Sequence, residues 1–216
     1  MKLITWFLDL LYPPKCVFCT RLLRSEETDI CAQCRTDLPR VEHRLYRGEC
    51  YECCYAAYYY KDAVAASVKK FKFSGRPYYA EAYGRILAML ILQERVEFDL
   101  ISWVPISDRR AKQRGYRQSK LLAEAIANEL GEQAVQTLRK IKDNPAQSSV
   151  RKPSERKLNV KNVYCAVSEE NFSGKRILLV DDVITSGATL SECARTLKRA
   201  GAKSIVCVTL AAATND

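Results

Sequence analysis

The chain has 216 residues, of which 48% are hydrophobic and 28% charged, and its formal net charge is +10 at pH 7. This length accommodates one α/β domain of about 150 residues and a small additional domain. The positive charge favours polyanionic partners such as nucleic acid, nucleotides or pyrophosphate. No segment approaches the roughly 20 consecutive apolar residues of a membrane-spanning helix. We therefore expect a cytoplasmic protein without a membrane span.

The chain begins with an apolar run that is interrupted by Asp9 and ended by Pro13 and Pro14. This run lacks the small-residue cleavage site of a signal peptide. We expect residues 1–14 to form a short amphipathic helix that packs on the rest of the protein.

Seven of the ten cysteines lie between Cys16 and Cys54, several of them in close pairs. Two pairs with two intervening residues each can bring four thiolates to one tetrahedral Zn²⁺ ion. The predicted ligands are Cys16, Cys19, Cys31 and Cys34. A site closed by four sulfurs has no open position, so this zinc is expected to be structural. For Cys50, Cys53 and Cys54, with His43 nearby, a second metal site and ordinary buried thiols both remain open.

Strands and helices alternate after the cysteine-rich segment. The patterns predict a strand at 55–60, a helix at 62–72 capped by Asp62, a helix from Pro77 to Leu92 and a strand at 100–106. A loop is expected at 107–119, and then a helix that Ser119 caps and Gly131 ends. Strands at 134–141, 159–167, 176–183 and 204–210 and a helix at 189–200 complete the series. Nearly apolar strands that alternate with helices predict a parallel sheet covered on both faces.

These patterns divide the chain into two predicted domains. Residues 1–54 are expected to hold the amphipathic helix and a zinc ribbon, and residues 55–216 the α/β domain. Ligands of such parallel sheets bind at the carboxyl ends of the strands.

Two acidic residues end the strand at 176–183. Asp181 and Asp182 follow four apolar residues, and two neighbouring carboxylates can accept hydrogen bonds from the 2′ and 3′ hydroxyls of a ribose. The turn after them offers backbone N–H groups, hydroxyls and a helix N-terminus, which suit a phosphate. Its residues are Val183, Ile184, Thr185, Ser186, Gly187, Ala188 and Thr189. A strand with an acidic end and a simple helix cap is the alternative, but a ribose with a 5′ phosphate fits both parts of the segment.

This segment resembles the signature of the type I phosphoribosyltransferases, which bind phosphoribosyl pyrophosphate (PRPP). Further blocks resemble the ComF family of competence-associated phosphoribosyltransferase-like proteins: residues 71–76 (PheLysPheSerGlyArg), 104–106 (ValProIle) and 114–119 (ArgGlyTyrArgGlnSer). Gln147, Arg156, Asn159 and Val160 fit another of its segments. One departure is Arg117, which stands where the family usually has Asn.

The resemblance implies a fold, a set of ligands and a set of sites. The fold is a type I phosphoribosyltransferase-like parallel sheet with helices on both faces and an N-terminal zinc ribbon. Asp181 and Asp182 hold the ribose at the catalytic centre, and Arg109, Arg110 and Arg114 are the charge partners of pyrophosphate. Mg²⁺ accompanies PRPP, and residues 142–157 form a flexible lid.

The positive charge is concentrated in the centre of the chain. Residues 103–161 contain 14 Lys and Arg against 6 Asp and Glu, a surplus of 8. Such a stretch can hold the backbone of a single-stranded DNA, or it can be a solvated basic face. The candidate contacts are Arg110, Lys112, Arg114 and Arg117.

Two functions follow as hypotheses. The first is a PRPP-binding protein of DNA uptake and natural transformation, with single-stranded DNA and competence proteins as partners. The second is an active phosphoribosyltransferase that transfers the phosphoribosyl group to an unknown acceptor in nucleotide or related metabolism. A pure zinc-ribbon interaction module would leave the acidic segment unexplained.

Overall fold

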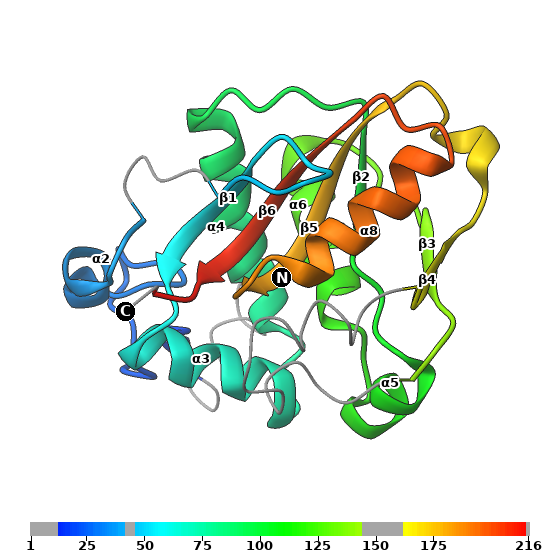
Figure 1. Cartoon of the computed structure of the whole chain (residues 1–216). Helices are drawn as coiled ribbons and strands as arrows, with labels where there is room; N and C mark the ends of the chain where they lie inside the picture. The colour runs from blue at the N-terminus through cyan, green and yellow to red at the C-terminus, as the bar shows by residue number, and fades with distance from the viewer. Residues whose placement is uncertain (1–12, 42–45, 144–161, 215–216) are drawn as a thin grey trace.

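The computed structural model describes residues 13–41, 46–143 and 162–214. Four parallel strands form its central sheet in the order β1 (Cys54–Tyr59), β6 (Ser204–Ala212), β5 (Arg176–Ile184) and β2 (Leu100–Trp103). In Figure 1 the arrowheads of β1 and β6 point towards α3 (Asp62–Phe73), which lies at the carboxyl ends of these strands. The predicted parallel sheet is confirmed.

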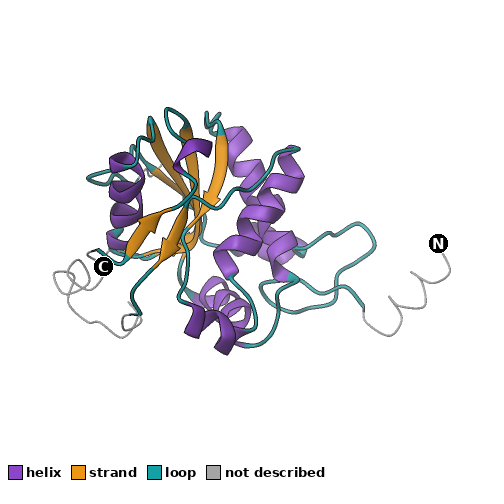
Figure 2. Cartoon of the chain, turned by 90° about the vertical axis from the view of Figure 1, so that its right-hand side faces the viewer, coloured by secondary structure: helices purple, strands orange, loops and turns teal. Residues whose placement is uncertain are grey.

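Helices cover both faces of the sheet (Figures 1 and 2). On one face α4 (Tyr79–Gln93) and α6 (Gln118–Leu130) pack together; on the other lie α8 (Ala188–Arg199) and the antiparallel pair β3 (Leu138–Lys140) and β4 (Tyr164–Ala166). Alternate residues of β5 enter different cores, because successive side chains of a strand point to opposite faces. Leu178 and Val180 belong to the core with α4 and α6, whereas Ile177 and Leu179 belong to the core with α8.

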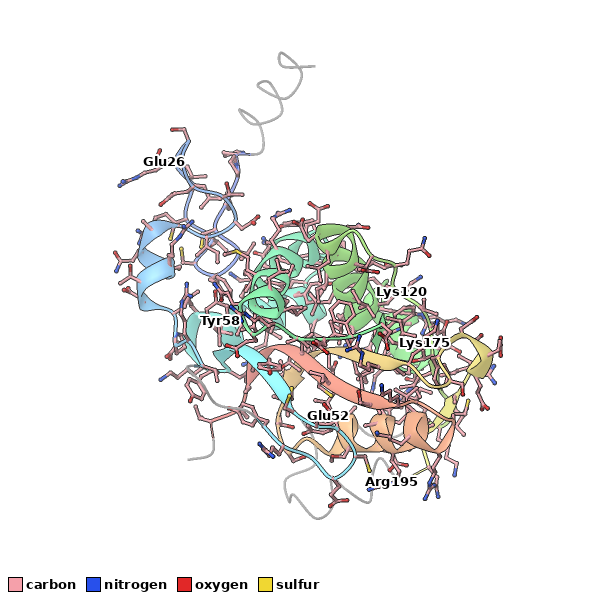
Figure 3. All side chains as sticks on the ribbon, turned by 90° about the horizontal axis from the view of Figure 1, so that it is seen from above. Glu26, Glu52, Tyr58, Lys120, Lys175 and Arg195 are labelled. Carbon is pink, nitrogen blue, oxygen red and sulfur yellow. The ribbon has the colours of Figure 1, made fainter. Side chains whose placement is uncertain are left out.

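The cysteine-rich segment, with α2 (Ala32–Asp37), projects at one end of the sheet, as Figure 3 shows around the label of Glu26. It is tied to the α/β domain by an aromatic contact and an ion pair. The ring of Phe18 meets that of Tyr58 edge to face, with 5.3 Å between the centroids. Nε and Nη2 of Arg85 donate hydrogen bonds to the carboxylate of Asp29, at 2.6 and 2.7 Å. The two parts therefore share one core.

Three local predictions are wrong. Asp62 does not cap α3, because Lys61 is the cap residue and makes no side-chain cap hydrogen bond. Ser119 does not cap α6: the cap position is Arg117, and Ser119 is buried inside the first turn. The expected loop at 107–119 contains a helix, α5 (Asp108–Arg114), whose cap is Ser107. The predicted end of α6 at Gly131 is confirmed, since this residue is left-handed, with φ 71°.

The remaining elements follow the prediction with shifted ends. The strand expected at 134–141 is reduced to β3, and a short 3-10 helix, η2 (Glu169–Asn171), precedes β5. The predicted N-terminal helix lies mostly outside the described residues, as do His43 and most of the lid at 142–157. Within the described ranges no helix is long and apolar enough to cross a membrane.

Candidate functional site

The two acidic residues lie near the end of β5, at the carboxyl edge of the sheet. Asp182 is buried, and its Oδ1 lies 2.7 Å from Nζ of Lys72 at the end of α3. Asp181 is half-buried, and its Oδ1 accepts hydrogen bonds from Oγ of Ser119 and from the backbone N–H of Asp182, both at 2.9 Å. Strand neighbours face opposite sides, so the two carboxylates have different surroundings.

Burial makes the protonation of Asp181 differ from that of Asp182. Desolvation raises the pKa of Asp181 to about 7, and the neighbouring charge of Asp182 adds to this effect, whereas Lys72 opposes it. A carboxyl group with such a pKa exchanges its proton near neutral pH. The site therefore combines one ion-paired carboxylate with one carboxyl group that can change its charge.

Arg114, the last residue of α5, is a predicted pyrophosphate partner on which the charges of both carboxylates act. Its pKa is lowered by burial, while the negative charges of Asp182 and Asp181 act in the opposite direction. Its Nη1 donates to Oε1 of Gln118 at 2.8 Å, and its guanidinium carbon lies 4.9 Å from the ring centroid of Phe73. Arg114 thus links α5, α6 and the end of α3 beside the carboxylates.

The other basic candidates lie along α5 and just after it. Arg109 is exposed and pairs with Asp143, and Arg117 pairs with Asp108 at 2.6 Å. Arg110 is half-buried and Lys112 is exposed. The structure thus gathers the predicted arginines on α5 and just after it, where the charges of the acidic pair act on Arg114 and that of Arg110 acts on Lys140.

The turn after β5 gives the phosphate candidates unequal exposure. Thr185 and Ser186 are exposed, and the side chains of Ile184 and Ala188 are buried, so these two offer backbone groups alone. Gly187 precedes α8 with φ 70°, a conformation that favours glycine. A Cβ atom there would lie 2.8 Å from the hydroxyl oxygen of Tyr51. Segment 46–51 therefore packs directly against the turn.

Lys140 and Tyr164 flank the same site and were missed in the sequence. Burial lowers the pKa of Lys140 to about 8, with Arg110 acting in the same direction and Asp143 in the opposite one. Its Nζ lies 5.7 Å from the ring centroid of Tyr164. The charge of Asp181 also raises the pKa of Tyr164, after burial as the larger cause. These residues come from β3 and β4, whose contribution to the site depends on tertiary packing. Lys72, in contrast, lies in the 71–76 block, which the sequence had already singled out.

The four predicted zinc ligands come together. The Sγ atoms of Cys16, Cys19, Cys31 and Cys34 all lie within 4.8 Å of one another. Zn–S bonds of about 2.3 Å in a tetrahedron place sulfurs about 3.8 Å apart, and Cys19 Sγ lies 3.6 Å from Cys31 Sγ. The residues fit a closed Zn²⁺ site. Within the described ranges Cys50, Cys53 and Cys54 join no second group of metal-binding side chains; Cys54 is fully buried in β1.

Three tyrosines are held by structural contacts. Tyr58 and Tyr79 are buried in the core, and Tyr116 donates its hydroxyl to the backbone oxygen of Phe71. Tyr78 and Phe73 are exposed aromatic side chains, at 59% and 67%.

The fold and site define a type I phosphoribosyltransferase-like protein with a zinc ribbon. Residues 117–216 match the phosphoribosyl transferase domain family, and residues 7–57 match the double zinc ribbon domain family. The chain belongs to the ComF family, which includes the DNA utilization protein YhgH and competence protein F. YhgH of Salmonella typhimurium is 30% identical over 202 residues, which cover 88% of this chain and 86% of the relative.

Other relatives are more distant. Competence protein F of Haemophilus influenzae is 25% identical over 215 residues, covering 88% of this chain and 93% of that protein. Among solved structures, the allosteric regulatory enzyme of purine biosynthesis gives a TM-score of 0.45 at 23% identity, covering 65% of this chain and 29% of that one. Adenine phosphoribosyltransferase of Thermoanaerobacter pseudethanolicus gives a TM-score of 0.41 at 18% identity, and the match covers 70% of this chain and 84% of that one.

Proposed function

We propose that this protein binds PRPP with Mg²⁺ and acts in DNA uptake during natural transformation. The carrying observation is the acidic pair at the end of β5, continuous with the turn into α8. In the proposed complex Asp181 and Asp182 accept the ribose hydroxyls. The 5′ phosphate meets Val183, Ile184, Thr185, Ser186, Gly187, Ala188 and Thr189, whose exposed members are at the carboxyl edge of the sheet.

The charges around the acidic pair suit the remainder of PRPP. The charges of both carboxylates act on Arg114, and the charge of Asp181 acts on Lys140. Arg114, with Arg109 and Arg110, is proposed to bind pyrophosphate, because a guanidinium fork makes paired, charge-assisted hydrogen bonds. Mg²⁺ would be held mainly by PRPP oxygens and water, as is usual for this ion.

Calorimetry with PRPP and Mg²⁺ tests this proposal. Replacement of both Asp181 and Asp182 by Asn should weaken binding at least a hundredfold, because hydrogen bonds to charged groups contribute about 1.5–3 kcal/mol each. Glu132→Gln is the matched control, because Glu132 is exposed after α6, away from the carboxylates. Equal affinity of the double variant and the control would exclude the ribose-binding role.

The role in DNA uptake is supported by the names of the relatives, DNA utilization protein and competence protein F. Single-stranded DNA is proposed to follow the basic residues of α5 and its end. A cavity of about 150 Å³ continues this surface and is lined by Trp103, Arg117, Lys120, Arg139 and Lys140, among others. Positively charged grooves are typical of surfaces that bind single strands without sequence preference.

Phosphoribosyl transfer is the second candidate function, and the pKa of Asp181 near 7 favours it. The lone pair of an acceptor would form a bond to C1′ while the bond from C1′ to pyrophosphate breaks. Pyrophosphate leaves with the bonding electrons, and the acceptor's proton passes to a base. Release of pyrophosphate from PRPP that requires an added acceptor and is lost in Asp181→Asn would establish this activity.

A further inference from the structure

A buried chain of hydrogen bonds connects the cysteine-rich segment to α3. Oγ of Ser67, on α3, donates to the backbone oxygen of Val17. Val17 itself lies between Cys16 and Cys19 of the four-sulfur cluster. The Ser67 hydroxyl is also 2.6 Å from Oη of Tyr83, on α4. Because a serine hydroxyl has one proton and gives it to Val17, Tyr83 is the donor in this second bond.

Apolar rings surround these hydroxyls. The ring of Tyr83 meets that of Phe71 edge to face at 5.4 Å, and the ring of Phe18 lies 6.0 Å away. Ser67 and Tyr83 are both fully buried. A buried hydroxyl that loses its partner in such surroundings is not compensated by water. The carbonyl of Val17 therefore fixes where Ser67, and with it α3, lies against the cysteine-rich segment.

The same helix carries the cation that pairs with the acidic end of β5. Lys72 follows Ser67 by five residues, which is about 7.5 Å along a helix axis. Its Nζ lies 2.7 Å from Oδ1 of Asp182. Since α3 is one continuous helix over Asp62–Phe73, a displacement at Ser67 moves Lys72 relative to the carboxylate.

We infer that Ser67 is a positioning residue that couples Zn²⁺ in the four-sulfur cluster to the acidic pair. With zinc bound, the turn between Cys16 and Cys19 is fixed, and the Val17 carbonyl holds α3 where Lys72 compensates Asp182. The predicted effect on PRPP rests on the proposed ribose site, whereas the coupling of Ser67 to Lys72 needs no ligand.

A double-mutant cycle in urea unfolding tests this coupling. Lys72→Met should raise the equilibrium constant of unfolding at least about threefold less in a Ser67→Ala background than in the wild type, because the lysine is then no longer held against Asp182. Ser102→Ala is the matched control, since Ser102 is equally buried and lies 2.7 Å from Oγ1 of Thr137, outside this chain of hydrogen bonds. The effects of Ser102→Ala and Lys72→Met should be additive.

Calorimetry with PRPP and Mg²⁺ tests the consequence for the site, at a temperature where circular dichroism shows every variant folded. Ser67→Ala should retain zinc by elemental analysis and bind PRPP at least about fivefold more weakly, the lower end of usual coupling between sites. Ser102→Ala should stay within twofold of the wild type. So should Tyr83→Phe, which keeps the bond between Ser67 and Val17.

Coupling between two binding sites is reciprocal, so PRPP should also strengthen zinc binding. Competition for zinc with a chromophoric chelator measures this on the whole protein. PRPP should raise the zinc affinity of the wild type at least about fivefold and that of Ser67→Ala less than twofold. An unchanged zinc affinity in wild-type protein that binds PRPP would exclude the coupling.

The failures of the two proposals are distinguishable. If wild-type protein does not bind PRPP but Ser67→Ala and Lys72→Met are coupled in unfolding, the ribose site fails and the positioning role stands. If these two effects are additive, the inference is overturned whatever PRPP does. If Ser67→Ala and Ser102→Ala weaken PRPP binding equally, the hydroxyl contributes only to stability, and the inference is again overturned.

Discussion

Lys72 and Asp182 are 110 positions apart in the chain, yet Nζ of one lies 2.7 Å from Oδ1 of the other. Both side chains are largely buried, with 20% and 11% exposure. The contact joins the 71–76 block to the acidic end of β5. It gives a physical reason for the presence of a lysine in that block, because a buried carboxylate needs a compensating charge.

Removal of this lysine should destabilise the protein. Lys72→Met leaves the carboxylate of Asp182 without its cation, and we expect the free energy of unfolding to fall by about 1–3 kcal/mol at pH 7. Lys69→Met, on an exposed position of the same helix, should change it by less than about 0.5 kcal/mol. Addition of Asp182→Asn should recover part of the loss in urea unfolding. Equal stability of the two lysine variants would contradict the pairing.

Asp181→Asn should make stability less dependent on pH. The pKa of Asp181 is raised from 3.8 in the unfolded chain to about 7 in the folded one. Between these two pH values folding takes up a proton. This group therefore lowers the stability of the wild-type protein progressively as the pH rises from about 4 to about 7, and above pH 7 its full destabilising effect is present. Asparagine carries no such loss and can still accept from Ser119.

Urea unfolding at pH 5 and pH 8 measures this effect. We expect Asp181→Asn to gain on the order of 1–3 kcal/mol over wild type at pH 8, and less at pH 5. Parallel pH profiles of the two proteins would show that Asp181 has an ordinary pKa.

Gly187→Ala should disturb the phosphate turn. The new methyl group would lie 2.8 Å from the hydroxyl of Tyr51, in a backbone conformation that alanine rarely adopts. Gly174→Ala is the control, since its φ of 73° imposes the same strain with no atom within 4 Å. We expect PRPP affinity to fall about tenfold or more in the first variant and to stay unchanged in the second. Identical calorimetric affinities would remove this turn from the binding site.

Purified protein should contain about one Zn²⁺ per chain. Cys31→Ser should lose the metal and lower the melting temperature of the whole protein, because Phe18 of the ribbon packs on Tyr58 and Tyr83 of the α/β domain. Cys165→Ser, in β4, should keep the metal. Elemental analysis and thermal melts decide the matter, and a zinc-free wild-type protein that stays folded would refute the assignment.

Binding of single-stranded DNA should weaken with salt, with a logarithmic slope of about −0.7 per phosphate neutralised. Replacement of Arg110, Lys112, Arg114 and Arg117 by Ala should reduce the slope by up to about 2.8, which is 0.7 for each of four contacts. Replacement of four exposed cations elsewhere, Arg21, Arg24, Lys175 and Lys203, removes the same charge and should leave the slope nearly unchanged. Fluorescence anisotropy at several salt concentrations measures both slopes. Equal slopes would mean that net charge, rather than this surface, attracts the DNA.

Features with a strong local pattern were predictable. The apolar run before Asp181 and Asp182 determined a buried strand with an acidic end, because a parallel strand is covered on both faces. The spacing of Cys16, Cys19, Cys31 and Cys34 determined a four-sulfur cluster, because each pair forms a tight turn. In both cases the residues that matter are close neighbours in the sequence.

Helix α5 shows where local patterns fail. None of its seven residues is buried, so it has no apolar periodicity, and its cap Ser107 was not distinguishable from any other serine in a polar segment. Ser119 shows the reverse error. A serine before an apolar helical pattern suggests a cap, but this one is buried and bonds to a carboxylate 62 positions away.

The sequence by itself determined the order of the four central strands and of the helices α3, α4, α6 and α8 along the chain, the cysteine cluster and the acidic turn, because each depends on local periodicity or spacing. Tertiary structure alone decided the different environments of the two aspartates. Lys72 compensates one, whereas Ser119 and burial act on the other. The charge state of a buried group depends on desolvation and on partners from distant segments, and these are fixed only when α3, α6 and β5 pack together.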